Sequence, residues 1–375
     1  MNLAGPSERS GGDLNDADIA RRRLINQRVE GEGFERPEEV VRWLGAIQAQ
    51  DYLQAVWAIG LRLKSATLAD IERAILEGKI VRTWPMRGTL HFVPPEDGGW
   101  MLKLSASRVL ARDERRLARL ELDRGIMERS GELFYEALRG NRRLTRPEMM
   151  AVLEEAGIST RGQRGYHILW YLAQSALICL GPMQDKQQTF VLLDEWVPHS
   201  RELSREDSLA ELAGRYFESH GPATVHDFAW WTGLTVADAR SGLEAAMPGL
   251  VSEKLEGREY WMTGDALGYG AYDGSSAHLL PAFDEFLLGY KDREAVLAAD
   301  DAQRVVPGKN GIFLPIIVVG GRVIGTWKRK LRKSSIDLTL SPFTDLGGSE
   351  ERVIEAATSY SDFVGLPMSA VARSS

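Results

Sequence analysis

A repeated pattern limits the folds open to this chain: segments with helical periodicity are followed by two short strand-like segments joined by a turn. Paired strand segments of this kind are expected at about residues 81–93, 178–193 and 250–262. Each pair follows three segments whose apolar residues recur every three or four positions, as in helices that bury one face. Three helices and a two-stranded hairpin form the winged-helix plan, a helix-turn-helix with a wing. The sequence therefore predicts tandem winged-helix units.

The composition changes after about residue 265. Residues 279–345 are rich in glycine, proline and β-branched residues, and Gly320-Gly321 is typical of a hairpin turn. The predicted fold class is α+β, with tandem winged-helix units followed by a small antiparallel C-terminal β-barrel or sheet. The expected divisions are a disordered lead-in (1–14), a first winged helix (15–99), a basic connector with a second winged helix (100–199), a third winged helix (200–268) and a β-rich domain with a terminal helix (269–375).

The composition is that of an ordinary soluble globular protein, with 375 residues of which 44% are hydrophobic and 26% charged. The single cysteine, Cys179, excludes an intramolecular disulfide and a cysteine-based zinc cluster. No apolar run approaches the roughly 20 residues that a membrane span needs. We therefore expect a cytoplasmic protein without a membrane partner.

The sequence predicts neither a cofactor nor a metal ion. It contains no G-x-G-x-x-G fingerprint, no phosphate-binding loop and no serine or cysteine nucleophile motif. His199, His220 and His226 lack the spacing of metal ligands. Asp284 and Glu285 could supply a carboxylate, and a hydrogen bond that closes the predicted barrel is the alternative.

Basic residues are concentrated in two segments, although the formal net charge is −7. Residues 100–146 hold 12 Lys and Arg against 7 Asp and Glu, and residues 321–333 hold six basic residues and no acidic one. DNA responds to this local field rather than to the net charge. The basic runs are therefore candidate phosphate contacts, and a solvated surface is the alternative. The residues concerned are Arg142, Arg143, Arg146, Lys328, Arg329 and Lys330.

The first expected wing carries a second kind of candidate. Trp84 could stack on a base or fill the gap left by a displaced nucleotide. Packing of the wing onto its own helices is the alternative for this side chain. Arg82 and Arg87 flank it and suit phosphate contacts, with surface ion pairs as the alternative.

Two glutamines, Gln48 and Gln50, stand one residue apart at the end of an apolar run. On an α-helix, residues i and i+2 point about 200° apart. The two amides can therefore share one pocket only if the backbone leaves the helix near Ala49. Such a break is expected because Asp51 can cap a following helix. A cap or a solvent contact is the structural alternative for the pair.

Several segments resemble the winged-helix DNA glycosylases of the AlkZ/YcaQ type. They are I-Q-A-Q-D (47–51), V-R-T-W-P-M-R-G-T-L-H-F-V (81–93), L-L-P-A-F-D-E-F-L-L-G-Y-K-D-R (279–293) and the stretch 305–327. The resemblance covers almost the whole chain after the lead-in. It implies tandem winged helices and a C-terminal β-barrel around a positively charged DNA channel, and the excision of alkylated purines. Some members remove N7-alkylguanine or undo interstrand crosslinks, often as self-resistance to alkylating natural products.

The catalytic element of that family is a glutamine–apolar–glutamine motif, which falls here on Gln48, Ala49 and Gln50. An N7-alkylated guanine is cationic and leaves as a neutral base, so no general acid is required. A glutamine oxygen can place water at C1′ and stabilise the oxocarbenium-like transition state without titrating. We therefore expect a monomeric glycosylase acting on double-stranded DNA with alkylated purines. The alternatives are a non-enzymatic DNA-binding protein and an interaction scaffold.

Overall fold

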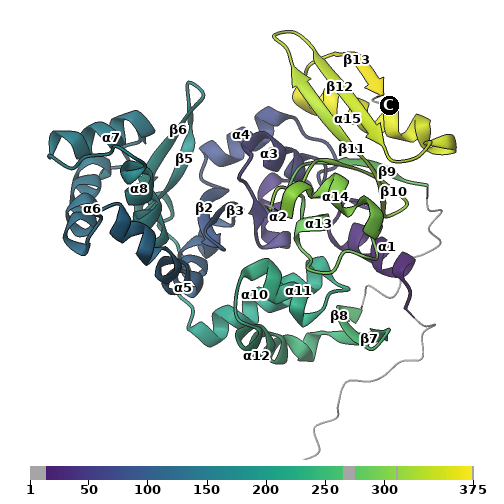
Figure 1. Ribbon diagram of the computed structural model, residues 1–375, viewed down its shortest axis with the longest axis horizontal. Helices are drawn as coiled ribbons and strands as arrows, with labels where there is room; N and C mark the ends of the chain where they lie inside the picture. The colour runs from purple at the N-terminus through teal and green to yellow at the C-terminus, as the bar shows by residue number, and fades with distance from the viewer. Residues whose placement is uncertain (1–13, 265–274, 310, 374–375) are drawn as a thin grey trace, which may run out of the picture. The chain divides into compact units, whose positions relative to one another are not determined.

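The computed structural model describes residues 14–264, 275–309 and 311–373 (Figure 1). Apart from Leu14, the predicted disordered lead-in lies outside the described residues. The chain divides into two compact units. We call residues 1–71 with 209–375 the discontinuous unit, and residues 72–208 the continuous unit. None of the helices in the described part combines the length and apolar character needed to cross a membrane.

The helices begin where the sequence places capping residues. Asn15 and Asp18 form a capping box at the start of the first helix, and Pro37 is the first residue of the second. Thr235 caps another helix by accepting a hydrogen bond from the backbone N–H of Asp238. In the discontinuous unit the helices are α1 (Asp16–Asn26), α2 (Pro37–Leu44), α3 (Tyr52–Gly60), α11 (Val225–Thr232), α12 (Val236–Ala246), α13 (Glu285–Leu288), α14 (Ala302–Val305) and α15 (Glu350–Val364), while α4 (Leu68–Leu76) and α10 (Arg205–His220) cross the division.

The C-terminal part of the discontinuous unit contains a five-stranded sheet in the order β13-β12-β11-β10-β9. It is an open sheet among the described residues, so a closed barrel does not form. The hairpin at Gly320-Gly321 is confirmed by the pairing of Val319 with Arg322. The strands are β9 (Ala277–Leu280), β10 (Ile316–Val319), β11 (Arg322–Leu331), β12 (Ile336–Pro342) and β13 (Met368–Arg373).

The expectation of a purely antiparallel sheet is wrong at one edge, because β13 runs parallel to β12. Helix α15 lies between them in the chain, and such a crossover returns the next strand in the same direction. Figure 1 shows α15 beside these strands. Tyr360 on α15 contacts Trp57 of α3 and Trp327 of β11 edge-on, with ring centroids 5.1 and 5.0 Å away. The core of this unit thus joins α3, α15 and the sheet.

The continuous unit has its own hydrophobic core, which includes Phe134, Met149, Ile168 and Phe190. Its strands follow one another in the order β3-β2-β5-β6-β4. The predicted basic connector forms two helices, because Asp123 caps the second of them. The elements are β2 (Val81–Met86), β3 (Thr89–Val93), α5 (Gly98–Arg119), α6 (Arg124–Leu138), β4 (Leu144–Thr145), α7 (Arg146–Glu155), α8 (Arg164–Gln174), β5 (Ile178–Gln184), β6 (Gln187–Leu192) and α9 (Leu193–Trp196).

The three predicted hairpins are confirmed as antiparallel pairs. The third is β7 (Val251–Leu255) with β8 (Arg258–Met262), whose turn residues Glu256 and Gly257 both have positive φ. The architecture is a mixture of helices and sheets. Among the residues described from Leu14 onward, four helices rather than three precede the first hairpin.

Candidate active site

The two glutamines lie in a short connector between α2 and α3, residues 45–51, which we call the glutamine connector. Helix α2 ends at Leu44, where Gly45 has a φ of +77° that favours glycine. The helix therefore breaks four residues earlier than the predicted position at Ala49. Asp51 accepts a hydrogen bond from the backbone N–H of Gln54 at 3.3 Å, so the predicted cap of α3 is confirmed.

The connector is extended at Ile47–Gln48, which form strand β1. Side chains at i and i+2 of an extended chain point to the same side. The helix has ended before both glutamines, but the strand includes Gln48 only and Gln50 lies in a bend, so a pocket shared by the two side chains stays a prediction. The two amides differ in accessibility, since Gln48 is 7% exposed and Gln50 is exposed. Ala49 between them is fully buried.

A buried carboxylate holds the connector from the inside. The backbone N–H of Gln48 donates to Oε1 of Glu285 at 3.1 Å. The other carboxylate oxygen accepts from the indole Nε1 of Trp231 at 2.8 Å, and His220 Nε2 lies 3.5 Å from it. Glu285 is 1% exposed, and both aromatic side chains are fully buried. An acceptor-only group with donors on both oxygens is the arrangement that makes a buried carboxylate tolerable.

His220 belongs to the same buried cluster. Its Nδ1 lies 2.8 Å from Oγ of Ser219, and its ring stacks on Tyr216 with centroids 4.7 Å apart. Burial lowers the pKa of His220, and the neighbouring Glu285 opposes this shift. The imidazole is therefore held mainly in its neutral form by desolvation.

A second buried carboxylate lies next in sequence. Asp284 receives two hydrogen bonds of 2.9 Å from the guanidinium of Arg62, and both side chains are almost fully buried. Arg62 also donates to the carbonyl oxygens of Gln27 and Ala58, each at 2.8 Å. The carboxylates at 284 and 285 therefore tie α13 to α1, α3 and the glutamine connector. Neither closes a barrel, which was the alternative expected for them.

Strand β11 brings part of the second basic segment to this site. The Arg329 guanidinium donates to the hydroxyl of Tyr360 and lies 3.8 Å from the carboxylate of Asp51, the residue after Gln50. Lys328 and Lys330 are exposed, as alternation along a strand requires of the opposite face. Residues 328–330 therefore comprise two lysines with solvated ammonium groups and one arginine that packs beside the connector.

The predicted wing residues lie in the continuous unit. Trp84 is 6% exposed and belongs to the hydrophobic core, as the packing alternative describes. Arg82 donates to the side chain of Gln188 at 2.8 Å. Arg87 lies 3.5 Å from Nε2 of the buried His91. Burial, together with the charge of Arg87, lowers the pKa of His91 from 6.5 to about 3.

Three arginines at the end of the first basic segment are exposed: Arg142 and Arg143 just before α7, and Arg146 at its start. Arg142 donates to backbone carbonyl oxygens near the end of α6, one of them at 3.1 Å. The guanidinium of Arg143 lies 4.8 Å from the ring centroid of Trp196, and that of Arg146 lies 5.8 Å from Tyr166. Their charged groups remain accessible to a ligand.

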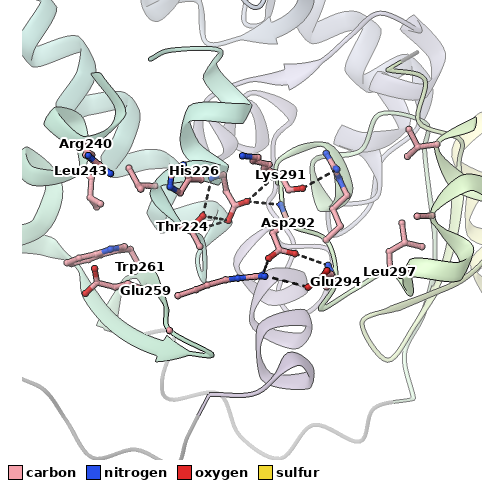
Figure 2. Close-up of a pocket in the computed structure, with 18 of the residues that line it drawn as sticks. Thr224, His226, Arg240, Leu243, Glu259, Trp261, Lys291, Asp292, Glu294 and Leu297 are labelled. Carbon is pink, nitrogen blue, oxygen red and sulfur yellow. Dashed lines mark hydrogen bonds and ion pairs between the residues drawn. The ribbon is translucent and has the colours of Figure 1, made fainter. Parts of the chain in front are cut away.

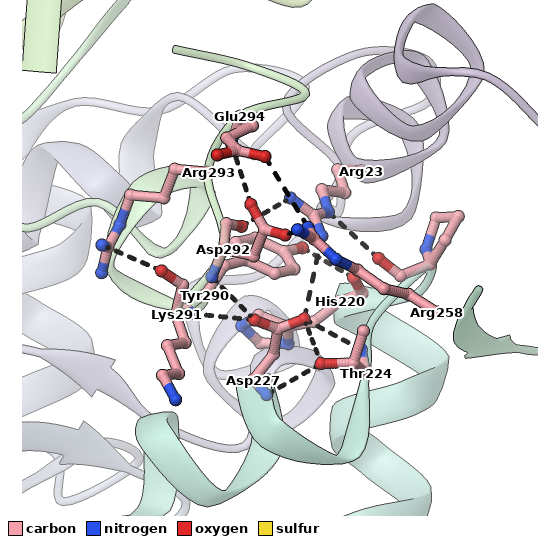
Figure 3. Close-up of polar contacts among 12 residues, drawn as sticks. Arg23, His220, Thr224, Asp227, Arg258, Tyr290, Lys291, Asp292, Arg293 and Glu294 are labelled. Carbon is pink, nitrogen blue, oxygen red and sulfur yellow. Dashed lines mark hydrogen bonds and ion pairs between the residues drawn. The ribbon is translucent and has the colours of Figure 1, made fainter. Parts of the chain in front are cut away.

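A groove elsewhere in the discontinuous unit has a volume of about 1120 Å³ (Figure 2). None of the predicted site residues lines it. Several of its polar residues, among them Thr224, Asp227 and Asp292, contact one another (Figure 3). Asp227 accepts from the backbone N–H groups of Lys291 and Asp292 at 2.9 and 3.0 Å, and from both donors of Thr224 at 2.9 Å. Arg258 pairs with Asp292. These contacts have a structural role.

Sequence reasoning missed the partners of the glutamines. The sequence gives no sign that Trp231 and His220 belong to the site, because each lies at least 170 positions from either glutamine. Glu285 was noticed only as a carboxylate in an otherwise apolar run. Such a charge in an apolar segment was the one available hint of a buried, paired carboxylate.

Known proteins resemble this chain over most of its length. The model of the AlkZ-like DNA glycosylase family matches residues 41–361. An interstrand DNA cross-link repair glycosylase from Streptomyces sahachiroi is 25% identical over 351 residues, which cover 90% of this chain and 93% of the relative. The solved structure of the DNA glycosylase AlkZ from the same organism has a similar fold, with a TM-score of 0.81 at 22% identity, over 96% of this chain and 100% of that chain. The chain therefore belongs to the AlkZ-like family of DNA glycosylases.

Proposed function

We propose that this glycosylase hydrolyses the N-glycosidic bond of cationic alkylated purines, such as N7-alkylguanine, in double-stranded DNA. The observation that carries the proposal is the Gln48-Ala49-Gln50 motif in the glutamine connector. The side chain of Gln50 is exposed, and the backbone N–H of Gln48 donates to Glu285. A neutral amide suits a substrate whose glycosidic bond is already weakened by the positive charge of the base.

In this proposal Gln50 makes the main contact, because its side chain is exposed. Its amide oxygen would hold the water that attacks C1′ and face the growing positive charge of the sugar. Gln48 would orient that water or the sugar. An amide is a poor base, so the site would act mainly on bonds that are labile already. Selectivity for cationic lesions would follow from this chemistry, without a metal ion or a nucleotide cofactor.

We assign the binding of the DNA backbone to the basic side chains. The exposed Lys328 and Lys330 on β11 and the arginines at the start of α7 have accessible charges, as phosphate contacts require. Arg82, Arg87 and Arg329 would add shorter-range contacts, and Trp84 would support the first wing by packing in its core. Tandem winged helices in the predicted divisions would present these groups to one duplex, bound by a monomer in the cytoplasm.

The relative from S. sahachiroi is named as an interstrand cross-link repair glycosylase. We extend the proposal to crosslinks and bulky natural-product adducts attached through purine N7, because both make the purine in the DNA cationic, so that it departs as a neutral base. Ala49, the middle residue of the motif, is small for an apolar position, so the pocket can differ in shape from that of relatives.

The test is release of free base by the wild-type protein from a duplex with one N7-methylguanine, with the unmodified duplex as the control. The proposal expects release from the alkylated duplex alone. Binding to both duplexes is measured in parallel. Tight binding of the alkylated duplex without any release would instead establish a non-enzymatic lesion-binding protein.

A further inference from the structure

We propose that Glu285 is a positioning residue for catalysis: its carboxylate fixes the glutamine connector by accepting the backbone N–H of Gln48. This inference rests on the proposed function, because it concerns the same glutamines. Glu285 touches neither the water nor the sugar in this account. It acts through the backbone of the connector.

The carboxylate is itself rigidly held. One carboxylate oxygen accepts a hydrogen bond from the backbone N–H of Gln48 at 3.1 Å, and the other accepts one from the indole N–H of Trp231 at 2.8 Å. The backbone carbonyl of Glu285 accepts from the side-chain amide of Gln27 at 3.3 Å, and Asp284 caps the helix that Glu285 begins. A group fixed at both its backbone and its carboxylate can transmit a defined position to the connector.

The connector is anchored at three places by groups of the same unit. A Cβ at Gly45 would lie 3.7 Å from the ring of Trp231, so the indole packs under the start of the connector. Glu285 holds its middle at Gln48. Asp51 caps α3 at its end and faces Arg329 at 3.8 Å. Of these three anchors, Glu285 alone bonds to a residue of the Gln48-Ala49-Gln50 motif.

The charge of Glu285 is what this role requires. A carboxylate has no hydrogen to donate, so it can satisfy Gln48 N–H and Trp231 N–H together. A glutamine at 285 has one oxygen and one NH₂ group. Its oxygen can accept a hydrogen bond from one of the two N–H donors. Its NH₂ group then faces the other N–H, and two donors cannot form a hydrogen bond with each other. Glu285→Gln therefore preserves the shape of the side chain and leaves either Gln48 N–H or Trp231 Nε1–H without its acceptor, which weakens the link between the connector and Trp231.

The experiment measures single-turnover release of N7-methylguanine at saturating protein, together with the Kd for the duplex and thermal unfolding. We expect Glu285→Gln to slow release about 100-fold, because a misplacement of about 1 Å costs this much. The Kd should stay within twofold, since Glu285 is buried and contacts no phosphate. Thr232→Val is the matched control: it removes a buried hydroxyl that donates to Phe228 O at 2.7 Å on the helix of Trp231, without contacting Glu285. Its release rate should equal that of the wild type.

A second variant keeps the inference testable if Glu285→Gln does not fold. Trp231→Phe removes the indole N–H that donates to the Glu285 carboxylate and shortens the ring that reaches Gly45, and release should slow about tenfold, as for other groups that act through a neighbour. Wild-type rates in both variants, with Gln50→Ala slow, would overturn the positioning role and leave the proposed function standing. A wild-type protein that releases no base would overturn the proposed function and this inference with it.

Discussion

The Arg62–Asp284 pair offers a test of how the site is supported. Both side chains are almost fully buried, and two hydrogen bonds of 2.9 Å join them. Replacing Arg62 with methionine keeps much of the aliphatic volume and leaves the Asp284 carboxylate buried without its cation. Breaking a buried pair from one side costs about 3–5 kcal/mol, because the remaining charge is uncompensated. Two backbone carbonyl oxygens also lose their donors.

For a unit of 150–250 residues, each kcal/mol lowers the melting temperature by about 2–4 °C. Arg62→Met should therefore lower the melting temperature of the discontinuous unit by about 6–20 °C. The assay is thermal unfolding followed by circular dichroism, with urea unfolding for the free energy. The double variant Arg62→Met with Asp284→Leu should regain part of the loss, since it removes both charges. A loss below about 1 kcal/mol in the single variant would refute the reasoning, because the carboxylate would then have another source of compensation.

Three further outcomes follow from the charged and titrating groups. The double variant Arg142→Glu with Arg143→Glu should weaken binding to all duplex sequences alike. Anisotropy titrations across salt concentrations should show a slope of log affinity against log salt that is smaller by about 0.9 per lost phosphate contact. An unchanged affinity would contradict the assignment of these two arginines to phosphate contacts. Lys328→Glu with Lys330→Glu should act in the same way with little change in thermal unfolding, because both side chains are exposed. His91 has its pKa lowered to about 3 in the folded state, so the unfolded state binds more protons below pH 6.5 and stability should fall from about pH 6.5 towards pH 3. Urea unfolding across this range should show a shallower fall in His91→Gln, and an equal fall would contradict the assignment.

Local signals were sufficient to predict much of the fold. Gly320-Gly321 predicts its hairpin because positive φ is a property of the residues in the turn itself. Asp51 predicts the start of α3 for the same reason, since a cap acts on the backbone next to it. The parallel pairing of β13 depends on α15 crossing back over the sheet, which is not a local property. The prediction of an antiparallel sheet followed by a terminal helix therefore lacks this parallel edge strand.

The candidate site also has features that local sequence predicts and features that it does not predict. The cap at Asp51 could be predicted from neighbouring residues, while the role of the glutamine pair stays a prediction. The anchor of the connector could not, because Glu285 and Gln48 are 237 positions apart. Spacing within a helix or strand carries no information about such a partner. The place of the helix break was also missed, since Gly45 was not distinguished from the other residues of an apolar run.

The most direct measurement is single-turnover release of N7-methylguanine by the glutamine variants. Gln50→Ala should slow release by about 10²–10³, the usual cost of losing one well-aimed dipole, while DNA affinity and thermal unfolding stay nearly unchanged. Gln48→Ala should also slow release. Gln50→Glu should retain activity, because a carboxylate stabilises an oxocarbenium ion more strongly. Alanine variants that release the base as fast as the wild type would show that the pair is structural and that the catalytic site lies elsewhere.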